Sequence, residues 1–474
     1  MEIFGYPVQL SDVCWTLLVL FAVSSIYDWV GWIIWKYKYN IKGTFPVPIF
    51  GIFLDFLLHP SADDAKRRML KYGPVQGGNA GHLKMIIVQD VDLMKKVLIT
   101  NHAQFQNRYS LMGLYYPPPA DKTLLELKDG EWKRVRSIVT PSFSSGKLKM
   151  MSTLISHCSE TLVKGLVEQA KKGAVIEPRK HFGCYTMDVI ASTAFGIETD
   201  SYNNPEDPFI QNAQKVFTTS TFDPLIILSM LYPRFGTLLV NLFGYSAYWP
   251  KGPLQFFSDV TKKVIDGRQK DDLTLDEIQS QSFIVFIAGY ETTSSLLNYA
   301  AYMLASHPDV QDRLIAETDK AVPQDCQEVT NDHIMEMPYL DMVVHLTMDR
   351  TTSQSQDVQL DGYWFPRDTM VVFDMHLMHH DETIYPEPDK FIPERFSAEG
   401  KSSRDPFTFM PFGHGPRNCI GMRLALLEAK IALVATLRKV MFVREPETEV
   451  PLNVLTSDNF LRTKNPIKVS VMLR

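Results

Sequence analysis

The chain has 474 residues, of which 45% are hydrophobic and 22% charged, and these ordinary proportions exclude a disordered chain and fit a globular protein. Its 48 basic and 54 acidic residues give a formal net charge of -6 at pH 7, which does not support nucleic-acid binding. The 5 cysteines are too few and too scattered for a secreted fold held by disulfides, so a reducing compartment is favoured. Length alone suggests about three domains.

Residues 13–35 are almost entirely apolar and, as a helix, long enough to cross a bilayer. Aromatic residues gather near the C-terminal end of this stretch, as in the aromatic belts of membrane proteins. Lys36, Lys38 and Lys42 follow it, whereas no basic residue precedes it. This asymmetry predicts a cytosolic body with the N-terminus across the membrane.

A cleaved signal peptide and a buried core helix are the alternatives for this apolar segment. A signal peptide opens with positive charge and ends at a small-residue cleavage site, and this segment has neither feature. We therefore expect residues 1–42, with their basic flank, to form an uncleaved single-pass anchor in the endoplasmic reticulum membrane.

The remainder of the chain reads as mostly helical. A proline-rich connector follows the anchor, and beyond it there is neither a low-complexity linker nor a repeat. Long apolar stretches without proline predict helices at residues 283–305 and 422–440, and short alternating runs at residues 363–365 and 370–373 predict a minor sheet. We therefore expect a mainly α fold with a small β portion, in a single domain that spans residues 43–474.

The segment 411–421, with the sequence PFGHGPRNCIG, directly precedes the second of these predicted helices. Its glycines allow the backbone to fold around Cys419 and allow a flat ligand to approach. A cysteine at a helix N-terminus is biased towards the thiolate, and Arg417 can neutralise an anionic group beside the same ligand. A lone thiolate is a poor zinc site but a good axial ligand for haem iron. The alternative is an inert, buried free cysteine.

The pattern Phe-x-x-Gly-x-Arg-x-Cys-x-Gly, which begins at Phe412, resembles the haem-binding loop of the cytochrome P450 family. The resemblance extends over nearly the whole chain, including the anchor and the proline-rich connector. It implies the cytochrome P450 fold behind a transmembrane helix, with haem b as the cofactor and Cys419 as the axial thiolate ligand of its iron. Gly413 and Gly421, in the same loop, are expected to contact the haem.

Residues 288–293, with the sequence AGYETT, lie within the predicted helix at 283–305. Small residues allow one helix face to lie against a flat cofactor, and a carboxylate next to a hydroxyl can pass protons. Taken alone, the segment also fits an ordinary core helix or a membrane span. Beside a thiolate loop it resembles the oxygen-activation motif of the family, which implies that Thr292 and Glu291 deliver protons and that Ala288 and Gly289 line the haem.

Trp132 and Arg136 are four residues apart in a predicted helix and therefore lie on one face. An indole N–H and a guanidinium suit the carboxylates of a haem edge, and in the family a helix of this pattern holds a propionate. Arg108 and Arg417 resemble further propionate partners, and Arg350 is a weaker candidate.

The neighbouring Lys133 and Arg134 are expected to point away from the haem. They form either a solvated helix face or a docking site for an acidic flavoprotein. The resemblance implies electron delivery by NADPH-dependent cytochrome reductase, with cytochrome b5 as a second candidate donor. By analogy with the family, the substrate pocket is expected to involve residues 109–121, residues 222–232, Phe283, Ile284 and Ile287.

The resemblance breaks where the family carries a Glu-x-x-Arg pair, whose salt bridge to the arginine of a later Pro-Glu-Arg-Phe segment buttresses the cysteine loop. Leu346 stands where the glutamate belongs and Asp349 where the arginine belongs. No Glu-x-x-Arg occurs between Glu317 and Arg395, so Arg395 needs a new partner. Removing one member of a buried ionic network commonly costs about 3–5 kcal/mol. The chain is also shorter than its relatives before Gly362.

Two classes of function follow. The first is a membrane-anchored haem-thiolate monooxygenase that inserts one oxygen atom of O2 into lipophilic, steroid-like or drug-like substrates. A sister branch of the family, which isomerises prostanoid endoperoxides without a reductase, ranks second among the enzymes. The other class is a catalytically silent or misassembled haem-binding variant, suggested by the missing Glu-x-x-Arg pair.

Overall fold

The structure is a computed structural model, which describes residues 2–3, 6–7, 10–45, 47–58, 62–80, 83–108, 120–217, 232, 251–265, 273–326, 328–346, 352–353, 358–367, 369–455 and 462–474. The chain forms two compact units, each assembled from separate parts of the sequence. The anchor unit comprises Met1–Tyr115, Thr221–Tyr245 and Thr351–Leu377, and the helical unit comprises Tyr116–Ser220, Ser246–Arg350 and Met378–Arg474. The predicted single domain over residues 43–474 stays a prediction.

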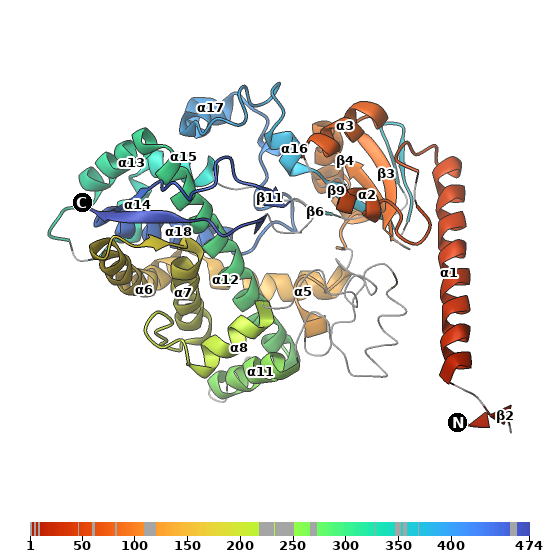
Figure 1. Ribbon diagram of the computed structural model, residues 1–474, viewed down its shortest axis with the longest axis horizontal. Coiled ribbons are helices and arrows are strands. Elements are labelled where there is room, and N and C mark those ends of the chain that lie inside the picture. Colours follow the sequence, from red (N-terminus) through yellow and green to blue (C-terminus); the bar gives the residue numbers. More distant parts are fainter. Residues whose placement is uncertain are drawn as a thin grey trace. The chain divides into compact units, whose positions relative to one another are not determined.

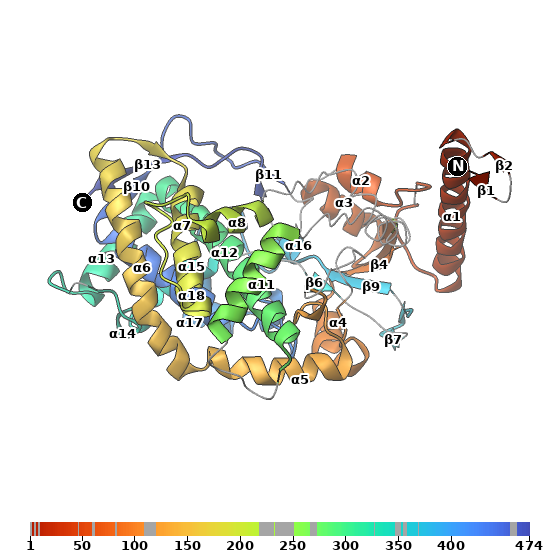
Figure 2. The same cartoon turned by 90° about the horizontal axis from the view of Figure 1, so that it is seen from below.

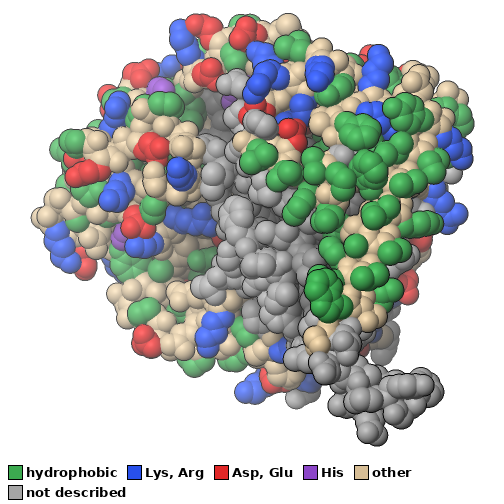
Figure 3. Space-filling model, turned by 45° about the vertical axis from the view of Figure 1, so that its right-hand side comes forward, with side chains coloured by type: hydrophobic (Ala, Val, Ile, Leu, Met, Phe, Trp, Pro, Cys, Tyr) green, Lys and Arg blue, Asp and Glu red, His purple; other side chains and the backbone are tan. Residues whose placement is uncertain are grey.

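Helix α1, Leu10–Lys38, is the long N-terminal helix of the anchor unit (Figure 1). Among the described residues, its stretch Leu18–Lys38 is the one helical segment long and apolar enough to cross a membrane. Its large apolar side chains are mostly exposed over this length and form a continuous hydrophobic surface (Figure 3). Other residues of α1 pack on the unit, since Ser25, Trp32 and Trp35 are buried and the ring of Phe21 lies 4.6 Å from the ring of Tyr232.

The main sheet of the anchor unit has the strand order β3-β4-β9-β6. Strand β4, Leu83–Val88, pairs in parallel with β9, Thr369–Phe373, so that Ile86 lies opposite Val371, and the other pairs are antiparallel. Both strands predicted from alternating runs are present, since β8 is Tyr363–Phe365. The remaining elements of this unit are β1 Glu2–Ile3, β2 Tyr6–Pro7, α2 Phe53–Leu58, α3 Ala62–Tyr72, β3 Val75–Ala80, α4 Val91–Lys95, β6 Thr352–Ser353 and β7 Val358–Leu360.

Helix α12, Leu275–Ser306, is the longest helix of the helical unit and packs along α7, Pro178–Ile190 (Figure 1). It begins earlier than the predicted helix at 283–305 because Thr274 and Glu277 form a capping box, which satisfies the free amides of the first turn. It ends as predicted, since Pro308 cannot continue it and opens the next helix.

Helix α18, Met422–Leu437, begins at the predicted position but ends short of residue 440. The next residues form strand β10, Val440–Val443, which pairs with β13, Val469–Leu473. The β-branched valines of β10 favour a strand over a further helical turn. Strand β13 also pairs with β5, Val175–Ile176, to complete a small antiparallel sheet.

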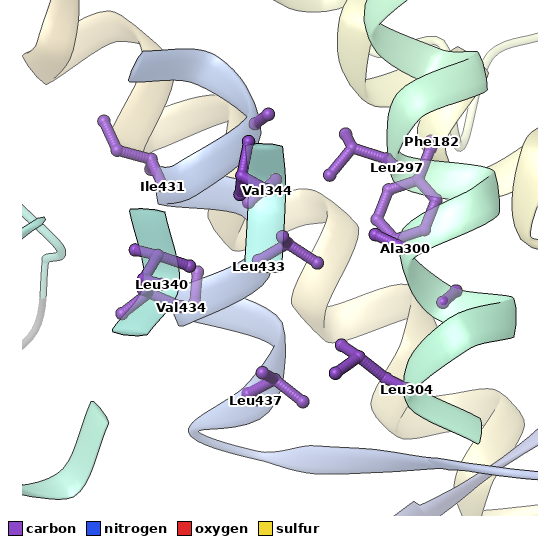
Figure 4. Packing of buried hydrophobic residues seen from close by; sticks show 14 of the residues in the cluster. Phe182, Leu297, Ala300, Leu304, Leu340, Val344, Ile431, Leu433, Val434 and Leu437 are labelled. Carbon is purple, nitrogen blue, oxygen red and sulfur yellow. The ribbon is translucent and has the colours of Figure 1, made fainter. Parts of the chain in front are cut away.

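The core of the helical unit lies between α18, α12 and α15, Pro338–Leu346 (Figure 4). Leu433, Val434 and Leu437 of α18 meet apolar side chains of α12 and α15 in this cluster.

Helices α5 and α6 follow one another along the sequence and join through a short turn (Figure 2). The other elements are α5 Asp129–Val139, α6 Ser145–Lys171, α8 Pro208–Phe217, α11 Lys251–Ile265, α13 Pro308–Ala321, α14 Asn331–Met335, α17 Ala398–Ser402, β11 Val454–Leu455 and β12 Arg462–Thr463, with α16 Met375–His379 at the boundary between the units. The expected mainly helical fold with small sheets is confirmed.

Candidate functional site

The loop around Cys419 is held by its own backbone. The Cys419 N–H donates to the Phe412 carbonyl at 2.8 Å, and the Asn418 N–H donates to the Gly415 carbonyl at 3.0 Å. Gly413 and Gly415 have φ angles of 69° and 76°, a left-handed conformation that is costly for other residues. The loop therefore presents a half-buried Cys419 immediately before α18.

Arg136 of α5 lies beside this cysteine. Its Nη2 donates to Oδ1 of Asn418, the residue before Cys419, at 3.1 Å. Burial lowers the pKa of Arg136, and an ionised Cys419 sulfur would oppose that effect. The structure thus brings together a thiol and a cation from segments far apart in the sequence.

Arg417 and Trp132 form a stacked pair next to the same loop. The Arg417 guanidinium carbon lies 4.0 Å from the centroid of the Trp132 ring, a cation–π geometry. The guanidinium also donates to the carbonyls of Leu124 at 3.3 Å and Leu127 at 2.9 Å. Trp132 is buried in a small cluster with Leu127 and Val135, so both side chains have restricted positions. The predicted roles of Trp132, Arg136 and Arg417 toward propionates stay predictions.

The predicted oxygen-activation motif is divided between two environments. Ala288 is exposed and Thr292 is half-exposed, although most of α12 around them is buried. The Thr292 hydroxyl donates to the Ala288 carbonyl at 2.6 Å, a bond within the helix that leaves its oxygen free to accept. These two residues lie one turn apart and share an accessible side of α12.

Gly289 and Glu291 instead contact α7. A Cβ on Gly289 would lie 2.3 Å from Cδ1 of Ile190, so the missing side chain allows the two helices to pack closely. Glu291 is buried and forms an ion pair with Arg179 at the start of α7. Its charge also contributes, after burial, to raising the pKa of the neighbouring Tyr290 to about 12. Both contacts fit the alternative in which this segment belongs to an ordinary core helix.

Some predicted residues fall elsewhere. Arg108 belongs to the anchor unit, whereas Cys419 belongs to the helical unit. Residues 109–119, residues 222–231 and Arg350, which were expected near the substrate or the haem, lie outside the described residues. Arg134 is not a free surface charge, since it forms an ion pair with Glu277 of α12, whereas Lys133 is exposed.

The arginine of the Pro-Glu-Arg-Phe segment has backbone partners. Nη2 of Arg395 donates to the Glu387 carbonyl at 2.5 Å and lies 3.4 Å from the Lys390 carbonyl. Its Nε is buried with no hydrogen-bond partner, and within the described part of the chain Arg395 makes no ion pair. This pattern is consistent with Leu346 standing in place of the family's glutamate.

The sequence comparisons identify the family. A family model described as Cytochrome P450 matches residues 41–243 and 250–471. The chain belongs to the cytochrome P450 family. Cytochrome P450 3A29 of Sus scrofa is 37% identical over 475 residues, which cover 92% of each chain. Cytochrome P450 3A14 of Cavia porcellus is 37% identical over 470 residues, and cytochrome P450 3A2 of Rattus norvegicus is 35% identical over 475 residues, both with the same coverage.

Membership of the cytochrome P450 family implies a thiolate-ligated haem and the monooxygenase class. The residues present fit such a group. Phe412, Cys419, Ile420 and Gly421 are all half-exposed, and the helix behind them is buried. The chain therefore presents one sulfur ligand on an accessible, largely apolar loop, with Arg136 beside it for an anionic substituent.

Proposed function

We propose that this cytochrome P450 is a membrane-anchored monooxygenase that inserts one oxygen atom of O2 into lipophilic, steroid-like or drug-like substrates. The observation that carries the proposal is Cys419, held at the start of α18 with Arg136 beside it, in a chain similar over most of its length to 3A cytochromes P450. The bound haem supplies reductive activation of O2 at a thiolate-ligated iron.

The protein residues have separate tasks in this proposal. Cys419 supplies the thiolate, and Gly413 and Gly421 leave the loop open to a flat group. Arg136 and Arg417 provide the cations for propionates, with Trp132 holding Arg417 in place. Arg108 remains a further candidate for a propionate.

Thr292 is the better candidate for holding a proton at the site. Its hydroxyl lies on the accessible side of α12 with Ala288, whereas the Glu291 carboxylate is buried and already neutralised by Arg179. A hydroxyl that donates to a carbonyl four residues earlier can rotate and donate outward instead, because the carbonyl retains its helical hydrogen bond. We therefore assign proton transfer to Thr292 and a positioning role to Glu291.

The anchor supports a location in the endoplasmic reticulum membrane with the body in the cytosol. The exposed apolar surface of α1 suits a lipid environment, and Lys36 and Lys38 lie in its last turn (Figure 3). Exposed Lys133 on α5 is a contact candidate for NADPH-dependent cytochrome reductase, and cytochrome b5 remains a second candidate donor.

The absorption spectrum of the reduced, CO-bound full-length protein tests the proposal. We expect the red-shifted Soret band of a thiolate-ligated haem, followed by NADPH-dependent oxidation of a lipophilic substrate when reductase is added. A thiolate band without turnover across a panel of steroids and drugs would favour the silent variant. An unshifted band would reject the monooxygenase function for this chain, and substrate isomerisation without reductase would favour an isomerase.

Thr292→Val is expected to lower turnover by at least about tenfold, because general acid catalysis by a side chain typically contributes about 10²–10⁴-fold. Valine keeps the shape of threonine but lacks the hydroxyl, so the reduced CO spectrum should not change. The measurement is the rate of product formation at saturating substrate and reductase.

Glu291→Gln is the matched comparison. Since Arg179 is partly exposed, we expect a loss of stability on the order of 1 kcal/mol and a smaller change in turnover than for Thr292→Val. The assignment of the proton to Thr292 is wrong if Glu291→Gln abolishes turnover at unchanged stability while Thr292→Val retains it.

A further inference from the structure

Asp341, in the first turn of α15, makes ionic contacts with two other elements. Its Oδ2 lies 2.7 Å from Nζ of Lys401 in α17, and its Oδ1 lies 2.7 Å from Nζ of Lys430 in α18. His345, one turn further along α15, places its Nδ1 3.4 Å from Oδ2 of the same carboxylate. One carboxylate therefore joins three segments that are 60 and 89 residues apart in the sequence.

This network differs from an ordinary surface salt bridge. The side chain of Asp341 is 29% exposed and that of Lys430 only 13%, so the pair is partly shielded from solvent. Burial by itself would raise the pKa of Asp341, but His345, Lys401 and Lys430 together lower it to about 2. The carboxylate is therefore charged near neutral pH.

The contacts of α15 reach both flanks of the cysteine loop. On the C-terminal flank, Lys430 belongs to α18, the helix that begins directly after the loop, and apolar side chains of α15 and α18 pack together around Leu340 and Val434 (Figure 4). On the N-terminal flank, the His345 ring lies 6.0 Å from the ring of Phe409. The carbonyl of the following residue, Met410, accepts a hydrogen bond from the Gly413 N–H in the loop.

The same helix is where the family's buttress is missing. Leu346 occupies the position of the glutamate, and Arg395 binds backbone carbonyls instead. Lys401 nevertheless ties the segment after Arg395 to Asp341, and the Phe396 ring lies 5.9 Å from the ring of His345. Helix α15 thus keeps its connections to this segment and to the cysteine loop through different residues.

We propose that Asp341, with Lys430 and Lys401, forms an ionic clamp by which α15 positions the Cys419 loop, in place of the missing Glu-x-x-Arg pair. Asp341 is a positioning residue in this proposal, since it acts on the site through α18 and the flanks of the loop. The inference rests on the proposed haem-thiolate function.

Asp341→Asn and Lys430→Met test the clamp in the full-length protein, with Lys430→Arg as the charge-preserving variant. Asp319→Asn is the control, because Asp319 forms an ion pair with Arg474 at 2.5 Å elsewhere in the helical unit. We expect the thiolate-type band of the reduced CO complex to convert to an unshifted band at least threefold faster in Asp341→Asn and Lys430→Met. Asp319→Asn and Lys430→Arg should behave as wild type.

The alkylation rate of Cys419 in the haem-free protein, followed by mass spectrometry of its peptide, gives a second measurement. A loosened loop exposes the half-buried sulfur, so Asp341→Asn should react several-fold faster than Asp319→Asn. Equal rates in both variants, or equal spectral conversion, would overturn the clamp. If wild type lacks the thiolate band, the proposed function fails and the alkylation rates alone decide the clamp. If Asp341→Asn does not fold, the same two rates are compared between Lys430→Met and Lys430→Arg, and equal rates in these variants would overturn the clamp.

Discussion

A chain in which Cys419 is replaced by serine is expected to lose the thiolate-type Soret band and essentially all reductase-supported turnover. Serine keeps the size of the side chain, but its hydroxyl remains protonated near neutral pH and cannot supply the thiolate that this family uses as its iron ligand. The backbone hydrogen bonds that shape the loop do not involve the sulfur. We therefore expect the free energy of unfolding of the haem-free variant to lie within about 1 kcal/mol of that of the haem-free wild type.

Cys158→Ser is the control for this experiment. Cys158 is also a free cysteine of the helical unit, and burial raises the pKa of its thiol to about 12, which makes it an unreactive protonated side chain. Its replacement should leave the CO spectrum unchanged. A persistent thiolate band in Cys419→Ser would show that another residue is the ligand.

Replacing Gly289 by valine should lower the free energy of unfolding by about 2 kcal/mol, within the usual range for overpacking a core. The added Cβ would meet Cδ1 of Ile190 at 2.3 Å and Cγ1 at 2.9 Å, and Ile190 is buried and has little space to move. Helices α12 and α7 would have to separate or shift. Denaturant unfolding of the haem-free chain measures the effect.

Ile190→Ala and Gly146→Val provide the controls. Removing the Ile190 side chain makes room for the valine, so Gly289→Val should cost less stability in the Ile190→Ala background than in wild type. Gly146 of α6 has no atoms within 4 Å of an added Cβ, and its valine variant reports the helix-propensity effect alone, a small gain because valine is a better helix former than glycine. Equal changes in stability for Gly289→Val and Gly146→Val, without relief by Ile190→Ala, would contradict the close packing.

The sequence predicted those helices and strands that are set by residues close together along the chain. The body of α12 follows from the uninterrupted apolar stretch at 283–305 with Pro308 beyond it, and α18 follows from the apolar stretch after the cysteine loop. Strands β8 and β9 follow from alternating runs. The ends of the helices differ from the predicted ones. A capping box makes α12 begin earlier, and the pairing of β10 with β13 makes α18 end earlier.

The positions of single side chains depended on packing. In the motif at residues 288–293, the sequence predicted proton delivery by Thr292 and Glu291, and the structure adds that the Glu291 carboxylate pairs with Arg179. Gly289 was expected to line the haem, and it faces Ile190. Helical spacing shows which residues share a face, but not which neighbouring element that face will meet.

The sequence by itself thus determined the family, the mainly helical fold, the apolar N-terminal helix and Cys419 as the candidate ligand, because each is written in a local run of residues. It also predicted that Leu346 stands where the family carries the glutamate of its Glu-x-x-Arg pair. Only the tertiary structure showed which ionic contacts the helix that carries Leu346 makes with other elements. Asp341 finds Lys401 and Lys430 at sequence separations of 60 and 89, and contacts at such distances arise only when folded elements pack together.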